Sequence, residues 1–199
     1  MNNEDTQSET GNSVNGFEKL ILAVPKNSVV LDVGAGGLEG FNTTDFLIAR
    51  FGVKNVKGIC IRPEKVAAYK ERFPEMDLIV GDFYKESHYK EKSFDLVVLD
   101  LNIKNNVIKD WSLEGLERMR GFLKEGGMLI NYVMTTDQYG DENETPALIR
   151  KRWKEFWHTD LLTYEDIGKR LTNLPGYELF AHEVEEIRPY IMWVCLKKL

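Results

Sequence analysis

The sequence contains little cysteine, little histidine and no excess of positive charge. Its 199 residues include two cysteines and three histidines, which do not recur at the spacing of a metal-binding cluster. Cys60 and Cys195 lie in separate apolar runs and are expected to be buried, reduced thiols. With 26 Lys and Arg against 32 Asp and Glu, the net charge of −6 argues against a protein whose affinity comes mainly from neutralising phosphates.

Long apolar runs are missing as well. No segment approaches the roughly 20 apolar residues that a membrane-spanning helix requires. The first ten residues are polar and acidic, which is the opposite of a secretion signal. We therefore expect a cytoplasmic protein without a membrane partner.

What remains is the composition of one globular domain. Hydrophobic residues make up 43% of the chain, enough for a sizeable core. Residues 1–14 are rich in Asn, Ser, Thr, Asp and Glu, so we expect a disordered tail followed by a single domain over residues 15–199.

Residues 29–40 (Val-Val-Leu-Asp-Val-Gly-Ala-Gly-Gly-Leu-Glu-Gly) predict a strand, a tight turn and the start of a helix. Glycines permit positive φ angles and allow a ligand to approach the backbone closely. A helix N-terminus behind them offers unpaired N–H groups and a positive dipole end. The segment therefore suits a nucleotide-like or carboxylate-bearing cofactor, although on its own it is equally compatible with a structural turn.

Strands and helices alternate along most of the chain. This pattern predicts a doubly wound α/β fold whose parallel sheet carries helices on both faces. Two final apolar runs are separated by a short connection and predict an antiparallel hairpin at one end of the sheet. The result is a mostly parallel seven-stranded sheet with an antiparallel last strand. Its expected strands are 29–33, 56–61, 78–80, 94–100, 128–134, 177–184 and 190–197, and the helices between them are 17–24, 46–51, 63–73, 111–124, 147–158 and 163–173.

Five motifs follow one another in a fixed order. They are residues 31–36 (Leu-Asp-Val-Gly-Ala-Gly), 58–64 (Gly-Ile-Cys-Ile-Arg-Pro-Glu), 80–82 (Val-Gly-Asp), 94–100 and 123–130. This ordered series resembles that of the class I S-adenosylmethionine-dependent methyltransferases. The resemblance covers residues 29–134 and implies a Rossmann-like methyltransferase fold, an enzyme that transfers methyl groups, and S-adenosylmethionine as its cofactor. It specifies no subfamily.

The resemblance also implies a cofactor site. Asp32 would hold the amino group of the methionine part, Asp82 would accept a hydrogen bond from the adenine amine, and Phe83 would pack against the adenine ring. Asp100 would position the amino-acid portion or the acceptor. Each aspartate also has a purely structural interpretation, as a turn or strand-end residue. The implied cofactor-binding set is Asp32, Gly34, Ala35, Gly36, Cys60, Ile61, Asp82, Phe83 and Asp100.

Two positions depart from the family pattern. Cys60 occupies the place where the family usually has an acidic residue that holds both ribose hydroxyls, and a thiol is a weak hydrogen-bonding partner. Leu38 stands where the third glycine of the turn is expected. These departures leave open a methyltransferase-like domain without activity. A nicotinamide-binding domain fits less well, because Glu39 stands where its fingerprint has the third glycine and Cys60 again replaces the acidic ribose ligand.

Methyl transfer from a sulfonium depends on alignment more than on acid–base groups. For a hydroxyl acceptor a base is useful, and the candidates are Asp100, Asp137 and His158, the last also interpretable as a partly buried helix-end residue.

A substrate-cap insertion is expected at about residues 135–162. The aromatic residues in and just beyond it suit a ring-bearing small molecule, which is the favoured acceptor. Basic side chains in the same insertion could bind RNA or another nucleic acid, which is the less favoured acceptor. They are also compatible with a solvated helix face that binds nothing. Nothing in the sequence indicates an oligomeric state. The aromatic residues are Tyr139, Trp153, Phe156, Trp157 and Tyr164, and the basic ones are Arg150, Lys151, Arg152 and Lys154.

Overall fold

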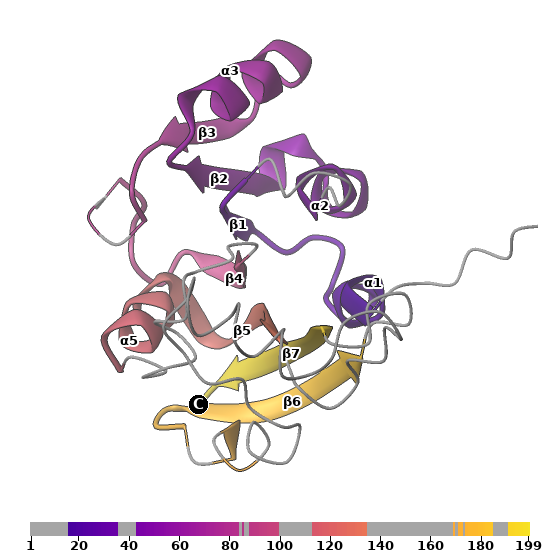
Figure 1. Cartoon of the computed structure of the whole chain (residues 1–199), viewed down its shortest axis with the longest axis vertical. Coiled ribbons are helices and arrows are strands. Elements are labelled where there is room, and N and C mark those ends of the chain that lie inside the picture. The colour runs from indigo at the N-terminus through magenta and orange to yellow at the C-terminus, as the bar shows by residue number, and fades with distance from the viewer. Residues whose placement is uncertain are drawn as a thin grey trace, which may run out of the picture.

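The chain forms a central sheet covered by helices on both faces (Figure 1). This computed structural model describes residues 16–35, 43–83, 85, 88–99, 113–134, 169, 171–172, 174–184 and 191–199. The predicted tail at residues 1–14 and the predicted insertion at about 135–162 lie outside the described residues, as do the predicted helix at 147–158 and most of that at 163–173.

The sheet has seven strands in the order β3-β2-β1-β4-β5-β7-β6. Strands β1 to β5 pair in parallel, whereas β7 is antiparallel to both of its neighbours, β5 and β6. The predicted doubly wound sheet and the antiparallel terminal hairpin are therefore confirmed. The strands are β1 (Val30–Val33), β2 (Val56–Cys60), β3 (Asp77–Val80), β4 (Phe94–Leu99), β5 (Leu123–Met134), β6 (Tyr177–Val184) and β7 (Ile191–Lys198).

The helices follow the predicted positions closely. They are α1 (Gly16–Leu22), α2 (Thr43–Phe51), α3 (Pro63–Arg72) and α5 (Leu113–Phe122), with a 3-10 turn, η1 (Val53–Asn55). Pro63 stands in the first turn of α3, where the missing N–H of proline costs no helical hydrogen bond. Within the described ranges, none of the helices has the length and apolar character needed to cross a bilayer.

The boundary between α5 and β5 differs from the prediction. The helix was expected to continue to Lys124 and the strand to begin at Met128, but the helix ends at Phe122 and the strand starts at Leu123. Leu123 pairs with Phe94, and the pairing then jumps to Leu96 opposite Met128. The residues between form an irregularity in which Gly126 takes a φ of 71°. Tertiary pairing thus overrides the local helical pattern.

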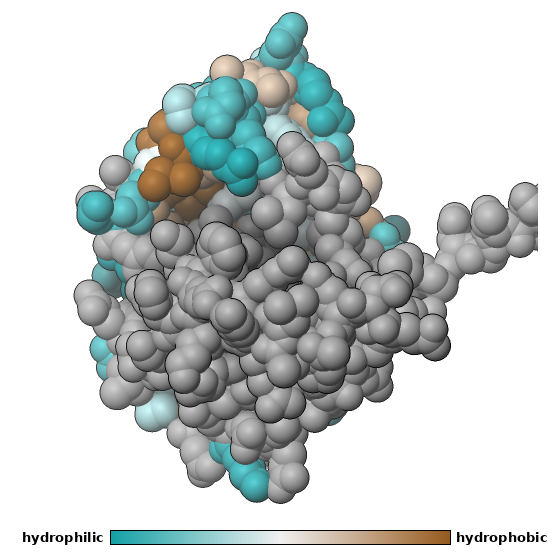
Figure 2. Space-filling view, viewed as in Figure 1, coloured by the Kyte–Doolittle hydropathy of each residue, from teal (hydrophilic) through white to brown (hydrophobic). Residues whose placement is uncertain are grey.

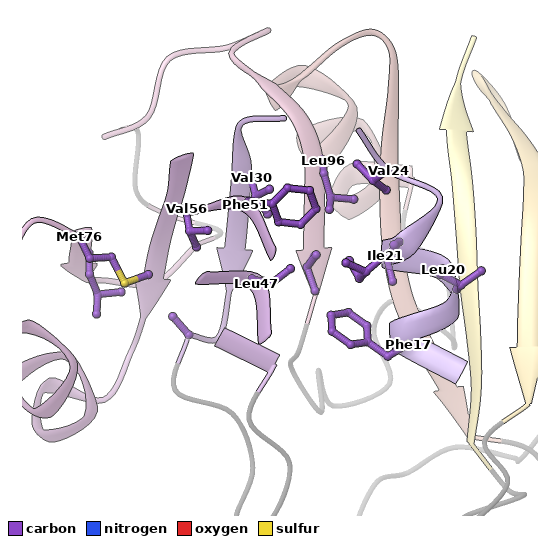
Figure 3. Packing of buried hydrophobic residues seen from close by; sticks show 14 of the residues in the cluster. Phe17, Leu20, Ile21, Val24, Val30, Leu47, Phe51, Val56, Met76 and Leu96 are labelled. Atoms are coloured by element: carbon purple, nitrogen blue, oxygen red, sulfur yellow. The ribbon is translucent and has the colours of Figure 1, made fainter. Parts of the chain in front are cut away.

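Two hydrophobic clusters fill the two sides of the sheet. One joins α1, α2 and α3 to the strands, and Figure 3 shows Phe17 and Ile21 of α1 beside Leu47 of α2 and the strand residues Val30 and Leu96. The other lies under α5 and contains a set of packed aromatic rings, described below. Both cysteines are free and buried, as predicted.

Burial of Cys195 predicts a loss of stability at alkaline pH. Burial raises the pKa of this thiol to about 12, against roughly 8.5 in an unfolded chain. Between these values the unfolded state releases a proton that the folded state keeps. The free energy of unfolding therefore falls as pH rises, by up to about 1.4 kcal/mol per pH unit. Burial also raises the pKa of Tyr89 and Tyr177, which adds to the loss at higher pH.

Urea unfolding of the wild type and Cys195→Val at about pH 8 and about pH 10.5 measures this effect. The variant is expected to lose less stability between the two pH values. An equal loss in both proteins would show that the thiol does not contribute.

Candidate functional site

The candidate site lies at the carboxyl ends of β1, β2 and β3. The strand order reverses between β1 and β4, and ligands of open α/β sheets bind outside the carboxyl ends at such a switch point. The structure brings seven of the predicted site residues to this edge, either within these strands or directly after them. They are Asp32, Gly34, Ala35, Cys60, Ile61, Asp82 and Phe83.

Gly34 directly follows β1 and has a conformation that favours glycine. Its φ is 94°, a region that side chains with a Cβ rarely adopt. Its N–H donates to the carbonyl oxygen of Ile59 at 2.8 Å, and the N–H of Ala35 lies 3.3 Å from the same oxygen. The turn is therefore fixed against β2 at the point where the chain leaves the sheet.

Asp32 connects β1 to the start of α2. Its side chain is fully buried, and the hydroxyl of Thr44 donates to its Oδ2 at 2.7 Å. This hydrogen bond holds the two ends of the glycine-rich segment at a fixed separation. It supports the structural interpretation of Asp32, while the contact with a cofactor amino group stays a prediction.

The thiol of Cys60 lies inside the protein. The residue is only 4% exposed and belongs to the hydrophobic cluster that also contains Ala35 and Val66. Its Sγ accepts the N–H of Arg62 at 3.5 Å. Cys60 therefore packs in the hydrophobic cluster, at the position where the family resemblance implies an acidic residue that binds the ribose.

Two apolar side chains remain open at the edge. Ile61 is 66% exposed and Val80 is 52% exposed, and they follow and end neighbouring strands. Figure 2 shows strongly hydrophobic side chains gathered over this part of the molecule. The set of site residues predicted from the sequence includes Ile61 but not Val80. The parallel pairing of β2 with β3 sets Cys60 opposite Val80, so the end of β3 lies beside the end of β2.

Asp82 stands beside this apolar pair at the start of a turn. Its side chain is 31% exposed, and one carboxylate oxygen lies 3.1 Å from Nζ of Lys85. The N–H of Lys85 also donates to the carbonyl oxygen of Asp82 at 2.9 Å, which closes the turn at residues 82–85. An apolar surface next to a carboxylate suits a flat heteroaromatic ring that carries an amino group.

Phe83, the next residue, is buried. Its ring packs 5.5 Å from that of Phe122 on α5, measured between centroids. Nε of Arg118, also on α5, donates to the carbonyl oxygen of Phe83 at 2.6 Å. The predicted contact between Phe83 and adenine stays a prediction.

The remaining predicted site residues lie outside the described residues. They are Gly36, Asp100, Asp137 and His158, together with the aromatic and basic side chains of the expected insertion. Among the described residues, no three His, Cys, Asp or Glu side chains are arranged to hold a metal ion.

Comparison with known families identifies this arrangement. A family model described as a methyltransferase domain matches residues 31–131, just over half of the chain. The chain belongs to this methyltransferase family. The match begins in β1 and ends in β5, so it contains every strand that contributes to the candidate site.

Solved methyltransferases share the fold. A TehB-like S-adenosylmethionine-dependent methyltransferase from Corynebacterium glutamicum is 19% identical, with a TM-score of 0.59 and coverage of 95% of this chain and 90% of the other. An Aquifex aeolicus S-adenosylmethionine-dependent methyltransferase is 16% identical, with a TM-score of 0.63 and coverage of 94% and 91%. The comparison with curated protein sequences returns no significant match.

A third solved structure contains bound small molecules. It is the 1,6-didemethyltoxoflavin-N1-methyltransferase of Burkholderia thailandensis with 1,6-didemethyltoxoflavin and S-adenosylhomocysteine. It is 15% identical, with a TM-score of 0.62 and coverage of 90% of this chain and 73% of the other. The family match confirms the predicted methyltransferase, and the solved structures show that the chain shares the fold of S-adenosylmethionine-dependent methyltransferases, one of them with S-adenosylhomocysteine bound.

The described residues fit this cofactor in two of its three parts. The positive-φ turn at Gly34 suits the amino-acid part, and Asp82 with the exposed apolar pair suits the adenine. The ribose part has no acidic partner at Cys60, whose thiol is buried.

The burial of Cys60 predicts that its thiol contributes to stability and not to cofactor binding. We expect Cys60→Ala to lower the free energy of unfolding by about 1 kcal/mol, because it removes buried sulfur contacts. The dissociation constant for S-adenosylhomocysteine should stay within about twofold of the wild type. Denaturant unfolding and calorimetric titration measure the two effects. A loss of affinity of about tenfold or more would mean that the thiol contacts the cofactor.

Proposed function

We propose that this methyltransferase transfers a methyl group from S-adenosylmethionine to a small-molecule acceptor. The observation that carries the cofactor site is the convergence of four features at one sheet edge. These are the turn at Gly34, the carboxylate of Asp82 and the exposed side chains of Ile61 and Val80. The net charge of −6 and the small heteroaromatic substrate of the Burkholderia enzyme support a small acceptor over a nucleic acid.

The chain's own residues would hold the cofactor in the following way. The backbone at Gly34 and Ala35 would face the amino-acid part, and Asp82 would accept a hydrogen bond from the adenine amine between Ile61 and Val80. When bound, the cofactor supplies a methyl group on a positively charged sulfur. The hydrogen bond from Thr44 to Asp32 keeps α2 and β1 in a fixed relation around the turn.

The reaction depends on aligning the acceptor atom with the methyl group. In our proposal the insertion at about 135–162 holds the acceptor. If the attacking atom is a hydroxyl oxygen, Asp100, Asp137 or His158 would accept its proton. We further propose a cytoplasmic location, since the two free cysteines suit a reducing compartment.

One specific observation favours a second candidate function, that of a methyltransferase-like binding domain without activity. The buried thiol of Cys60 leaves the ribose hydroxyls without the carboxylate that the family usually provides. Such a domain would bind the cofactor weakly and release no S-adenosylhomocysteine with any acceptor.

The proposal is tested by measuring release of S-adenosylhomocysteine from the purified protein and S-adenosylmethionine. One set of reactions receives aromatic and anionic small molecules, and a parallel set receives total RNA. We expect turnover with a member of the first set and none with RNA. Turnover with RNA alone would overturn the small-molecule proposal, and cofactor binding without any turnover would favour the binding domain.

A further inference from the structure

One arginine on α5 holds both the backbone and the ring of Phe83. Arg118 donates its Nε hydrogen to the carbonyl oxygen of Phe83 at 2.6 Å, across 35 residues of sequence. Its guanidinium carbon lies 5.5 Å from the centroid of the Phe83 ring and 5.6 Å from that of Phe122. The planar guanidinium can donate along its edge while its face covers aromatic rings. Phe83 is thus fixed at two points by a single side chain.

The rings beneath this arginine form a continuous support. The centroid of Phe122 lies 6.5 Å from that of Phe94, which in turn lies 5.7 Å from that of Tyr89. The Tyr89 hydroxyl donates toward the carbonyl oxygens of Gly58 at 2.7 Å and Asp77 at 3.0 Å. The aromatic column therefore reaches the two strands, β2 and β3, whose carboxyl ends carry the exposed apolar pair.

We propose that Arg118 is a positioning residue for the turn at 82–85, and through it a determinant of affinity for the adenine part of the cofactor. The inference rests on the proposed function, in which Asp82 receives the adenine amine. Lys85 closes the turn locally through two contacts with Asp82. Only the bond from Arg118 to Phe83, among the contacts described above, joins the backbone of the turn to α5. Loss of Arg118 removes this hydrogen bond to α5 and leaves the turn with a less fixed position, although the N–H of Gly81 still donates to the carbonyl oxygen of Cys60 at 3.0 Å.

The chain offers a matched control. Arg72, at the end of α3, also lies over two aromatic rings, at 5.3 Å from the centroid of Tyr69 and 5.0 Å from that of Phe73. Its guanidinium forms an ion pair with Asp45 at 3.1 Å. Arg72→Met therefore removes the same kind of double cation–π contact as Arg118→Met, but away from the turn.

The experiment titrates the full-length wild type, Arg118→Met, Arg118→Lys and Arg72→Met with S-adenosylhomocysteine. Hydrogen exchange at the Lys85 amide, which is bonded to Asp82, is measured in parallel. We expect Arg118→Met to raise the dissociation constant about tenfold, or about 1.4 kcal/mol, and to speed exchange at Lys85. Arg118→Lys keeps the charge and should lose affinity by a smaller factor, which keeps the test informative if the methionine variant does not fold. Arg72→Met should leave both readouts near the wild type.

Two results would overturn the inference while leaving the proposed function intact. One is a folded Arg118→Met protein with wild-type affinity and wild-type exchange at Lys85. The other is an equal loss of affinity in Arg72→Met, which would indicate general destabilisation. Absence of binding by the wild type itself would overturn the proposed function and this inference with it.

Discussion

Gly34→Ala is expected to remove most of the affinity of this methyltransferase for S-adenosylhomocysteine, raising the dissociation constant by about 100-fold. An alanine at a φ of 94° is strained, by roughly 1–3 kcal/mol, and relief of that strain requires the turn to move. Movement would break the hydrogen bond from the Gly34 N–H to Ile59. The added methyl group would also occupy the place where the backbone is expected to meet the cofactor. Calorimetric titration measures the loss.

Gly52→Ala is the control for this prediction. Gly52 also has a positive φ, 84°, and no atom lies within 4 Å of the position that its Cβ would take. It precedes η1, at the end of α2 away from the glycine turn. The substitution should therefore cost about 1 kcal/mol of stability and leave cofactor affinity unchanged. Equal loss of affinity in both variants would show that strain alone, and not the position of Gly34, explains the result.

Asp82→Ala is expected to weaken binding of S-adenosylhomocysteine by about 30-fold, or about 2 kcal/mol. The carboxylate is the charged acceptor proposed for the adenine amine, and hydrogen bonds to charged groups are worth about 1.5–3 kcal/mol. Inosine-containing analogues, which lack the amine, should bind the wild type and the variant almost equally. This comparison isolates the contact between Asp82 and the amine.

Asp77→Ala serves as the control, because Asp77 begins β3 and Asp82 lies just beyond the other end of that strand. Asp77 forms an ion pair with Lys57 at 2.7 Å, so its loss matches the loss of the Asp82–Lys85 pair. A surface ion pair contributes about 0–1 kcal/mol to stability, and cofactor affinity should not change. Wild-type affinity in Asp82→Ala would refute the assigned role of this carboxylate.

Local sequence patterns were sufficient to predict most of the sheet. The Pro63 helix start, the glycine turn after β1 and the terminal hairpin depend on residues that are neighbours in the chain. The start of β5 depends instead on pairing of Leu123 with Phe94 and on a long irregularity around Gly126. Such a pairing is decided by distant residues, and the helical period of α5 concealed it.

The candidate site, like the sheet, could be predicted where it depends on local sequence and not where it depends on contacts between distant residues. The motifs placed Gly34 and Asp82 just beyond strand ends, where the structure has them, and their contacts with a cofactor stay predictions. They gave no signal for Arg118, whose contact with Phe83 depends on how α5 docks on the sheet. The apolar run around Cys60, in contrast, did predict a buried thiol, and the structure places this side chain in the hydrophobic cluster.

The most direct test of the central claim is calorimetric titration of the full-length protein with S-adenosylmethionine and S-adenosylhomocysteine. If the carboxyl edge of β1, β2 and β3 is a working cofactor site, both compounds bind at one site per chain. Absence of binding by either compound at millimolar concentration would contradict the claim. The chain would then have the fold of a methyltransferase domain without its cofactor binding. Cys60, in the place of the acidic residue that usually holds the ribose, would be the residue that accounts for this loss.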